Sequence, residues 1–164
     1  MITSKNTSIN KNKVPILFSK VDKYFGWKPG SMNLDIGGGA YDSATKFLKK
    51  KKVTNFIYDP FNRSDEHNLA VRQFIGHAKA ESVTLSNVLN VIESTTVMKN
   101  LLKFAKKNME KEGVCYITCY NSKKKGISKK DCYQQGEPLS WYLPLVQEVF
   151  PAAEIRRGVI VAKN

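Results

Sequence analysis

The chain has 164 residues, of which 41% are hydrophobic, which suits one domain with a substantial core and leaves little for a second. No run approaches the roughly 20 apolar residues that a bilayer-spanning helix needs, and the polar start lacks the apolar centre of a signal peptide, so we expect a cytoplasmic protein, in the host cytoplasm if a virus encodes it. The net charge of +13 suits nucleic-acid binding, but 23 of the 27 basic residues are lysine, a skew that an AT-rich coding sequence would also produce.

The first predicted elements are a polar tail and a helix. Residues 1–13 are expected to form a flexible N-terminal tail, and residues 14–164 a single domain. Apolar residues recur at helical spacing from Val14 to Phe25, which predicts a helix over that range. The following run Gly26–Gly30, which contains a proline, ends it.

The stretch Met32–Asp42 reads as a buried strand that feeds a tight turn. An apolar run containing an acid is followed by three glycines, and residues 42–50 then read as a helix. Gly37 and Gly39 can adopt positive φ and let the backbone approach a ligand without a Cβ in the way. A dinucleotide site would need Gly-x-Gly-x-x-Gly, yet position 42 carries a carboxylate that would repel a pyrophosphate.

A second acid ends the next predicted strand, Val53–Asp59. Asp59 follows Gly39 by 20 residues, in line with the roughly 20 that separate a glycine turn from a ribose-binding acid in a strand-helix-strand unit. A glycine turn beside an unrelated surface acid is the alternative, but the paired spacing favours a nucleotide-binding edge.

The rest of the chain alternates helix and strand. This order predicts an α/β fold, a single Rossmann-like and mostly parallel sheet with helices on both faces. The expected elements are a helix from Ser64 to about Ile75, a strand from Ser82 to Leu85, a helix from Thr95 to Glu110, a strand from Val114 to Cys119, a helix from Leu139 to Phe150, and a strand or hairpin from Ile155 to Ala162.

These features resemble class I S-adenosylmethionine-dependent methyltransferases, whose first motif, acid-x-Gly-x-Gly, is matched by Asp35, Gly37 and Gly39. The resemblance covers roughly residues 14–162 and implies S-adenosylmethionine as the cofactor. It implies that Asp35 meets the methionine ammonium and that Asp59 takes both ribose hydroxyls. The cofactor-binding residues that it implies are Asp35, Gly37, Gly38, Gly39, Asp59, Pro60, Phe61, Ser86, Asn87 and Val88.

Two places depart from the pattern of that family. Only Gly76–Glu81 separates the helix after Asp59 from the next strand, so the family's third strand is expected to be vestigial or absent, which makes the sheet minimal. Pro60 directly follows Asp59, and the resulting stiff turn puts Phe61 either against the adenine or in the core.

The segment Ser86–Glu93 occupies the position at which members of this family place the residues that face the transferable methyl group. It has neither the prolines of DNA amino-methylating enzymes nor the Pro-Cys of cytosine-C5 enzymes, and it resembles methyltransferase-like proteins of phages and mobile elements. Asn87 and Asn90 would orient an acceptor or, slightly favoured, cap a helix. Candidate catalytic residues are Asn87, Asp131 and Tyr133, with His67 as a further possible base.

One cluster of lysines directly follows a predicted strand. Lys123, Lys124, Lys125, Lys129 and Lys130 follow the strand Val114–Cys119 and so lie at the carboxyl edge of the sheet, where such folds bind ligands. They would clamp RNA or DNA. The three cysteines, two of them on one face of that strand, include no Cys-x-x-Cys pair, so a reduced compartment and no zinc site are expected.

The sequence therefore predicts a methyltransferase that uses S-adenosylmethionine, with nucleic acid somewhat favoured as acceptor. The alternative is a degenerate or phage accessory protein that binds the cofactor in order to sequester or degrade it. The oligomeric state is left open.

Overall fold

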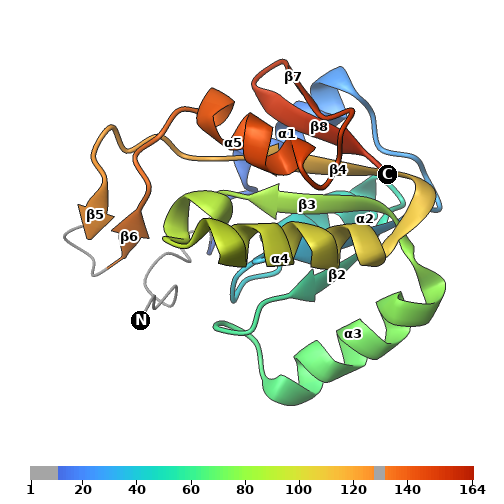
Figure 1. The fold of residues 1–164 in the computed structure, drawn as a ribbon. Helices are drawn as coiled ribbons and strands as arrows, with labels where there is room; N and C mark the ends of the chain where they lie inside the picture. Colours follow the sequence, from blue (N-terminus) through green and yellow to red (C-terminus); the bar gives the residue numbers. More distant parts are fainter. Residues whose placement is uncertain (1–10, 128–131) are drawn as a thin grey trace.

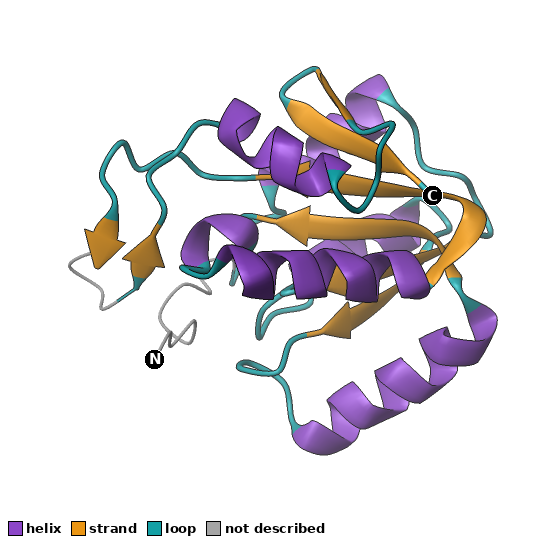
Figure 2. Cartoon of the chain, in the orientation of Figure 1, coloured by secondary structure: helices purple, strands orange, loops and turns teal. Residues whose placement is uncertain are grey.

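The computed structural model describes residues 11–127 and 132–164, so Lys129, Lys130 and Asp131 lie outside the described residues. A central sheet carries helices on both faces (Figures 1 and 2). In chain order the elements are α1 (Ile16–Tyr24), β1 (Met32–Ile36), α2 (Ser43–Lys50), β2 (Thr54–Tyr58), α3 (Asp65–Ala78), β3 (Ala80–Ser86), a 3-10 helix (Leu89–Val91), α4 (Thr95–Lys107), β4 (Met109–Thr118), β5 (Gly126–Ile127), β6 (Tyr133–Gln134), α5 (Leu139–Gln147), β7 (Glu154–Arg156) and β8 (Val159–Lys163).

The sheet has six strands in the order β2-β1-β3-β4-β8-β7. Strand β1 pairs in parallel with β2 and with β3, and β3 pairs in parallel with β4. Strand β8 runs antiparallel to β4, and β7 antiparallel to β8. The sheet is therefore mostly parallel, and the predicted α/β Rossmann-like class is confirmed.

The chain reverses its winding direction after β2. It moves from β1 to β2 through α2 and then steps back across β1 to reach β3 through α3. Because crossovers between parallel strands are right-handed, the reversal places α3 on the face of the sheet opposite to α2. No strand of the described residues pairs with the outer edge of β2, so the third strand that the sequence predicts to be missing is absent.

Each face of the sheet has its own core. On one face, α3, α4 and α5 pack on alternate strand residues, and this cluster includes Val71, Ile75, Met98, Leu102, Tyr142, Leu34, Ile36, Val83, Leu85 and Ile117. On the other face, α1 and α2 bury Leu17, Phe18, Val21, Ala44 and Leu48 against Val53, Tyr116 and Val161. In Figure 1, α3, α4 and α5 lie in front of the sheet and α1 and α2 behind it.

Several predicted boundaries were wrong. Helix α4 ends at Lys107 and β4 begins at Met109, because Asn108 closes the helix with its amide donating to Phe104 O at 2.8 Å. The early part of β4 is irregular: its register against β3 shifts between Ala80 and Ser82.

Other segments also differ from expectation. Helix α3 continues to Ala78 and α5 stops at Gln147, and the β5–β6 hairpin was not predicted. The terminal hairpin is confirmed, with its turn at Arg157 and Gly158 in the left-handed region. Among the described residues, no helix is long and apolar enough to cross a membrane.

Candidate functional site

The glycine turn joins β1 to α2 at the carboxyl edge of the sheet, and close contacts account for Gly37 and Gly38. Gly37 and Gly39 have φ of 72° and 78°, as predicted. A Cβ on Gly37 would lie 2.7 Å from Val88 Cγ2, so the turn packs against the loop that follows β3. A Cβ on Gly38 would overlap Asp35 Oδ2. The turn therefore brings the backbone closer to its neighbours than any side chain would allow.

Asp35 lies next to the turn and is almost fully buried. Its Oδ1 accepts a hydrogen bond from Thr84 Oγ1 at 2.9 Å, while its Oδ2 has no partner among the described residues. Burial raises the pKa of Asp35 to about 7; the Thr84 hydrogen bond opposes the rise, and the charge of Asp59 adds to it. A buried, unpartnered carboxylate oxygen is costly, so this atom marks a place for a donor or a cation.

Asp59, after β2, binds the turn from the other side. Its Oδ2 accepts the Gly39 N–H at 2.8 Å, and its Oδ1 accepts the N–H groups of Phe61 and Asn62 at 2.9 and 3.0 Å. Asn68, on α3, fixes the backbone of Asp59 by bonding both its N–H and its carbonyl. The two predicted acids are thus buried on either side of one glycine turn.

Arg63 connects the loops after β1 and β2. Its Nε donates to Gly39 O at 2.8 Å, and its Nη2 forms an ion pair of 2.8 Å with Asp42. The carboxylate at position 42, which argues against a pyrophosphate, is therefore neutralised by an arginine. Asp42 is more than half exposed, and Arg63 is mostly buried.

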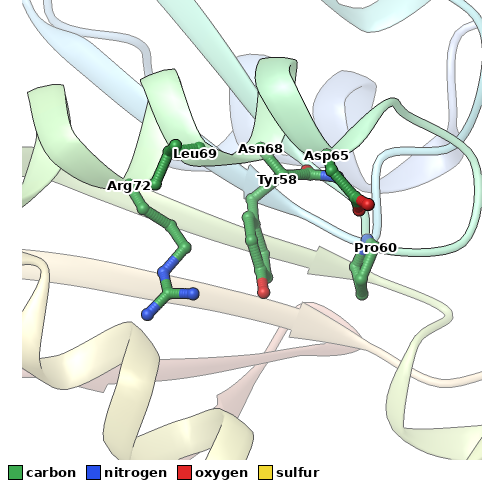
Figure 3. A pocket seen from close by; sticks show the side chains of 6 residues that line it. All are labelled: Tyr58, Pro60, Asp65, Asn68, Leu69 and Arg72. Carbon is green, nitrogen blue, oxygen red and sulfur yellow. The ribbon is translucent and has the colours of Figure 1, made fainter.

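Pro60 and Phe61 lie at the outer side of the site. Phe61 is 50% exposed, so the interpretation that it belongs to the core was wrong. A cavity of about 320 Å³ opens beside Pro60, between β2 and α3. Figure 3 shows the side chains that line it, with Tyr58 and Arg72 reaching toward the same side; the lining residues are Tyr58, Pro60, Asp65, Asn68, Leu69 and Arg72.

The loop after β3 carries the predicted Ser86, Asn87 and Val88. Asn87 has a φ of 57°, and its N–H donates to Thr118 O at 2.9 Å, which fixes the loop to the end of β4. The preference for Asn87 and Asn90 as helix caps was wrong, because Ser94 caps α4, its hydroxyl accepting the Val97 N–H. Asn90 instead donates from Nδ2 to Gln134 Oε1 at 2.9 Å, which joins this loop to β6.

Four buried side-chain oxygens of the described residues lack a hydrogen-bond partner, and all four lie toward the carboxyl edge of the sheet. They are Asp35 Oδ2, Asn90 Oδ1, Thr118 Oγ1 and the Tyr142 hydroxyl. Burial raises the pKa of Tyr142, with smaller contributions from the nearby Cys119, Glu137 and Tyr133, so its hydroxyl stays protonated at neutral pH. Buried polar groups are normally satisfied, so this edge is where a ligand or water would bind.

The remaining candidate residues lie apart from one another. Tyr133 is buried and donates its hydroxyl to Gln135 Oε1. His67 bonds Ile57 O at 2.8 Å on the outer edge of β2, which does not suit it as a base at this site. Lys123, Lys124 and Lys125 are exposed in the loop between β4 and β5, next to Tyr120, which is 59% exposed.

Sequence reasoning missed Asn62, Arg63 and Thr84. The turn after Asp59 carries a signal for the first, since an aspartate commonly accepts the N–H groups two and three residues on and so draws the next side chains toward its carboxylate. Arg63 and Thr84 carry no local signal, because their contacts join segments that are distant in the sequence.

No protein-family profile matches the sequence, and no curated protein matches it. Solved structures do match. The 1,6-didemethyltoxoflavin-N1-methyltransferase of Burkholderia thailandensis, solved with 1,6-didemethyltoxoflavin and S-adenosylhomocysteine, superposes with a TM-score of 0.66 at 11% identity, over 94% of this chain and 79% of its own. A S-adenosylmethionine-dependent methyltransferase from Aquifex aeolicus gives 0.61 at 16% identity, over 99% and 98%. The chain has the class I methyltransferase fold.

A third structure widens the range of acceptors among these neighbours. The 16S rRNA N2 G1207 methyltransferase of T. thermophilus, in complex with AdoMet and guanosine, gives a TM-score of 0.59 at 15% identity. The match covers 95% of this chain but only 45% of that enzyme. The shared fold thus serves both a small-molecule and an RNA acceptor, and at these identities the likeness concerns the fold.

Proposed function

We propose that the chain binds S-adenosylmethionine at the carboxyl edge of its sheet and transfers the methyl group to an acceptor. The observation that carries this proposal is the Gly37–Gly39 turn between two buried carboxylates, one of which has an unpartnered oxygen. The position also fits, because the chain leaves the neighbouring strands β1 and β3 in opposite directions along the sheet, and open α/β sheets bind ligands at such switch points.

The residues of this edge suit the parts of the cofactor. Asp35 Oδ2 would accept the methionine ammonium, directly or through water, and the absence of a Cβ on Gly38 keeps the space beside this buried oxygen free of a side chain. Asp59 would accept the ribose hydroxyls. The exposed ring of Phe61 and the side chain of Val88 would lie against the adenine, with Ser86 and Asn87 completing the loop opposite.

The cofactor supplies an electrophilic methyl group on a sulfonium, so the chain has chiefly to hold an acceptor in line with it. Asn87, Tyr133 and the undescribed Asp131 are the proposed catalytic candidates. The Tyr133 hydroxyl donates to Gln135 Oε1, and the backbone N–H of Asn87 donates to Thr118 O, so the Tyr133 hydroxyl and the Asn87 backbone would have fixed positions beside an acceptor.

Nucleic acid is the acceptor that we favour. The exposed Lys123, Lys124 and Lys125 stand at the same edge as the glycine turn, and the exposed ring of Tyr120 beside them offers a surface on which a base can stack. Lys129 and Lys130 belong to this proposal by sequence position alone.

Binding measurements test the proposal directly. We expect S-adenosylmethionine and S-adenosylhomocysteine, but not NAD or ATP, to give a calorimetric binding isotherm and to raise the Tm. Asp59→Ala should weaken S-adenosylhomocysteine binding by about 1.5 to 3 kcal/mol, roughly 10- to 100-fold, because a charge-assisted hydrogen bond is lost.

Equal Tm shifts with S-adenosylhomocysteine and NAD, or none with either, would contradict the proposal. Labelled S-adenosylmethionine then separates transfer from simple binding. Tight binding without a labelled product from RNA, DNA or small-molecule mixtures would favour the alternative, a protein that sequesters or degrades the cofactor.

A further inference from the structure

The carboxylate of Asp59 is already covered by a side chain of its own loop. Asn62 Nδ2 lies 3.2 Å from Asp59 Oδ1 and 3.1 Å from Oδ2, so one amide spans both oxygens. The Asn62 N–H also donates to Oδ1, at 3.0 Å. The amide thus bridges the two carboxylate oxygens in the way that two neighbouring hydroxyl groups would.

Four donor groups meet this carboxylate, and they differ in how easily they can leave. A carboxylate offers about four lone-pair positions, which the N–H groups of Gly39, Phe61 and Asn62 and the Asn62 amide engage. The three backbone donors are fixed by the turns that carry them. The Asn62 amide stands on two rotatable bonds and is only half-buried, so it can turn away without moving the backbone.

We propose that Asn62 occupies the ribose position of the cofactor site and must rotate out when the cofactor binds. The inference rests on the proposed function, because it assigns Asp59 to the ribose. A vicinal diol brings two O–H donors to the two oxygens and replaces one shared amide, so the exchange favours a ligand that carries both hydroxyls. Asn62 thereby lowers the affinity for every ligand that needs the Asp59 carboxylate.

Substitution of Asn62 should destabilise the empty protein but strengthen the binding of the cofactor product. In Asn62→Ala the empty protein loses the amide contact, so its Tm should fall by roughly 2 to 4 °C. The same loss removes the competitor, so S-adenosylhomocysteine should bind about three- to tenfold more tightly by calorimetry. The hydroxyl of Asn62→Ser is too short to span both oxygens. This variant should therefore also lower the Tm of the empty protein and bind S-adenosylhomocysteine more tightly.

Two controls belong to this experiment. Asn100→Ala, at an exposed asparagine of α4, should leave the affinity unchanged. Any binding of adenine, which has no ribose, should be equal in the parent and in both Asn62 variants.

The outcomes separate this inference from the proposed function. Binding of S-adenosylhomocysteine by the parent with an equal or weaker affinity in both variants would overturn the role of Asn62 and leave the proposed function standing. Absence of binding in the parent and in both variants would overturn both.

Discussion

At the scale of single residues, Asp35 gives the stability of the protein a pH dependence. Burial raises its pKa to about 7, above the value of 3.8 expected in the unfolded chain. Between about pH 4 and pH 7 the folded protein therefore holds a proton that the unfolded chain has lost, and the free energy of unfolding falls as the pH rises through this window.

Asp35→Asn should remove this dependence. The variant keeps a neutral group that can still bond Thr84, so its stability relative to the parent should increase from pH 4 to pH 7.5 by up to about 4 kcal/mol, from the pKa difference of about 3 units. Urea unfolding at several pH values measures it. Parallel pH profiles for parent and variant would show that Asp35 is not titrating in this window.

The same scale shows what a sequence can reveal about a site. The positions of Asp35, Gly37 and Asp59 could be predicted from the sequence because strand, turn and helix fix their spacing along one strand-helix-strand unit. The turn after Asp59 indicates that the Asn62 side chain lies near the carboxylate, but its bridging of both oxygens could not be predicted, since it depends on a side-chain rotamer. Thr84 and Arg63 act across strands and loops 20 or more residues apart, which no local pattern records.

At the scale of elements, the start of α3 fixes the loop that carries Asp59. Ser64 caps this helix by accepting the His67 N–H at 3.2 Å, and its carbonyl accepts the Asn68 amide at 3.0 Å. Ser64→Ala should cost about 1 kcal/mol in urea unfolding, because one helix-end donor loses its partner.

Ser140→Ala is the matched control for that cap. Ser140 is exposed in the first turn of α5, which has no side-chain cap, so this change should alter stability by less than about 0.5 kcal/mol. A loss at Ser64 no larger than that at Ser140 would contradict the capping role.

Element boundaries were predictable only where the chain itself breaks the pattern. The Ser64 cap and the glycine turn clearly mark where α3 and α2 begin. By contrast, no break in the apolar pattern shows that α4 ends before Asn108. Strand β4 begins early through its pairing with β3, and β5 and β6 are two residues each, too short to carry a periodic signal.

At the scale of the whole molecule, the missing third strand explains the arrangement of the layers. A strand on the outer side of β2 would have continued the first winding direction and kept α3 with α2. Its absence makes the chain turn back one strand early, which places α3 on the same face as α4 and leaves β2 at the edge. His67 then covers part of that edge by bonding Ile57 O, which limits pairing with another chain.

The net charge of +13 also belongs to the whole molecule, and its placement can be separated from its size. Replacing Lys123, Lys124 and Lys125 by Gln removes three charges at the carboxyl edge; replacing Lys103, Lys107 and Lys111 removes three near the opposite ends of the strands. If nucleic acid binds at the site, the first set should lower the slope of log affinity against log salt by about 2 to 3, and the second by clearly less. Oligonucleotide titrations between 50 and 200 mM salt measure both, with S-adenosylhomocysteine affinity unchanged in each variant. Equal slopes for the two sets would mean that the charge acts without a defined interface, and an acceptor other than nucleic acid would then be favoured.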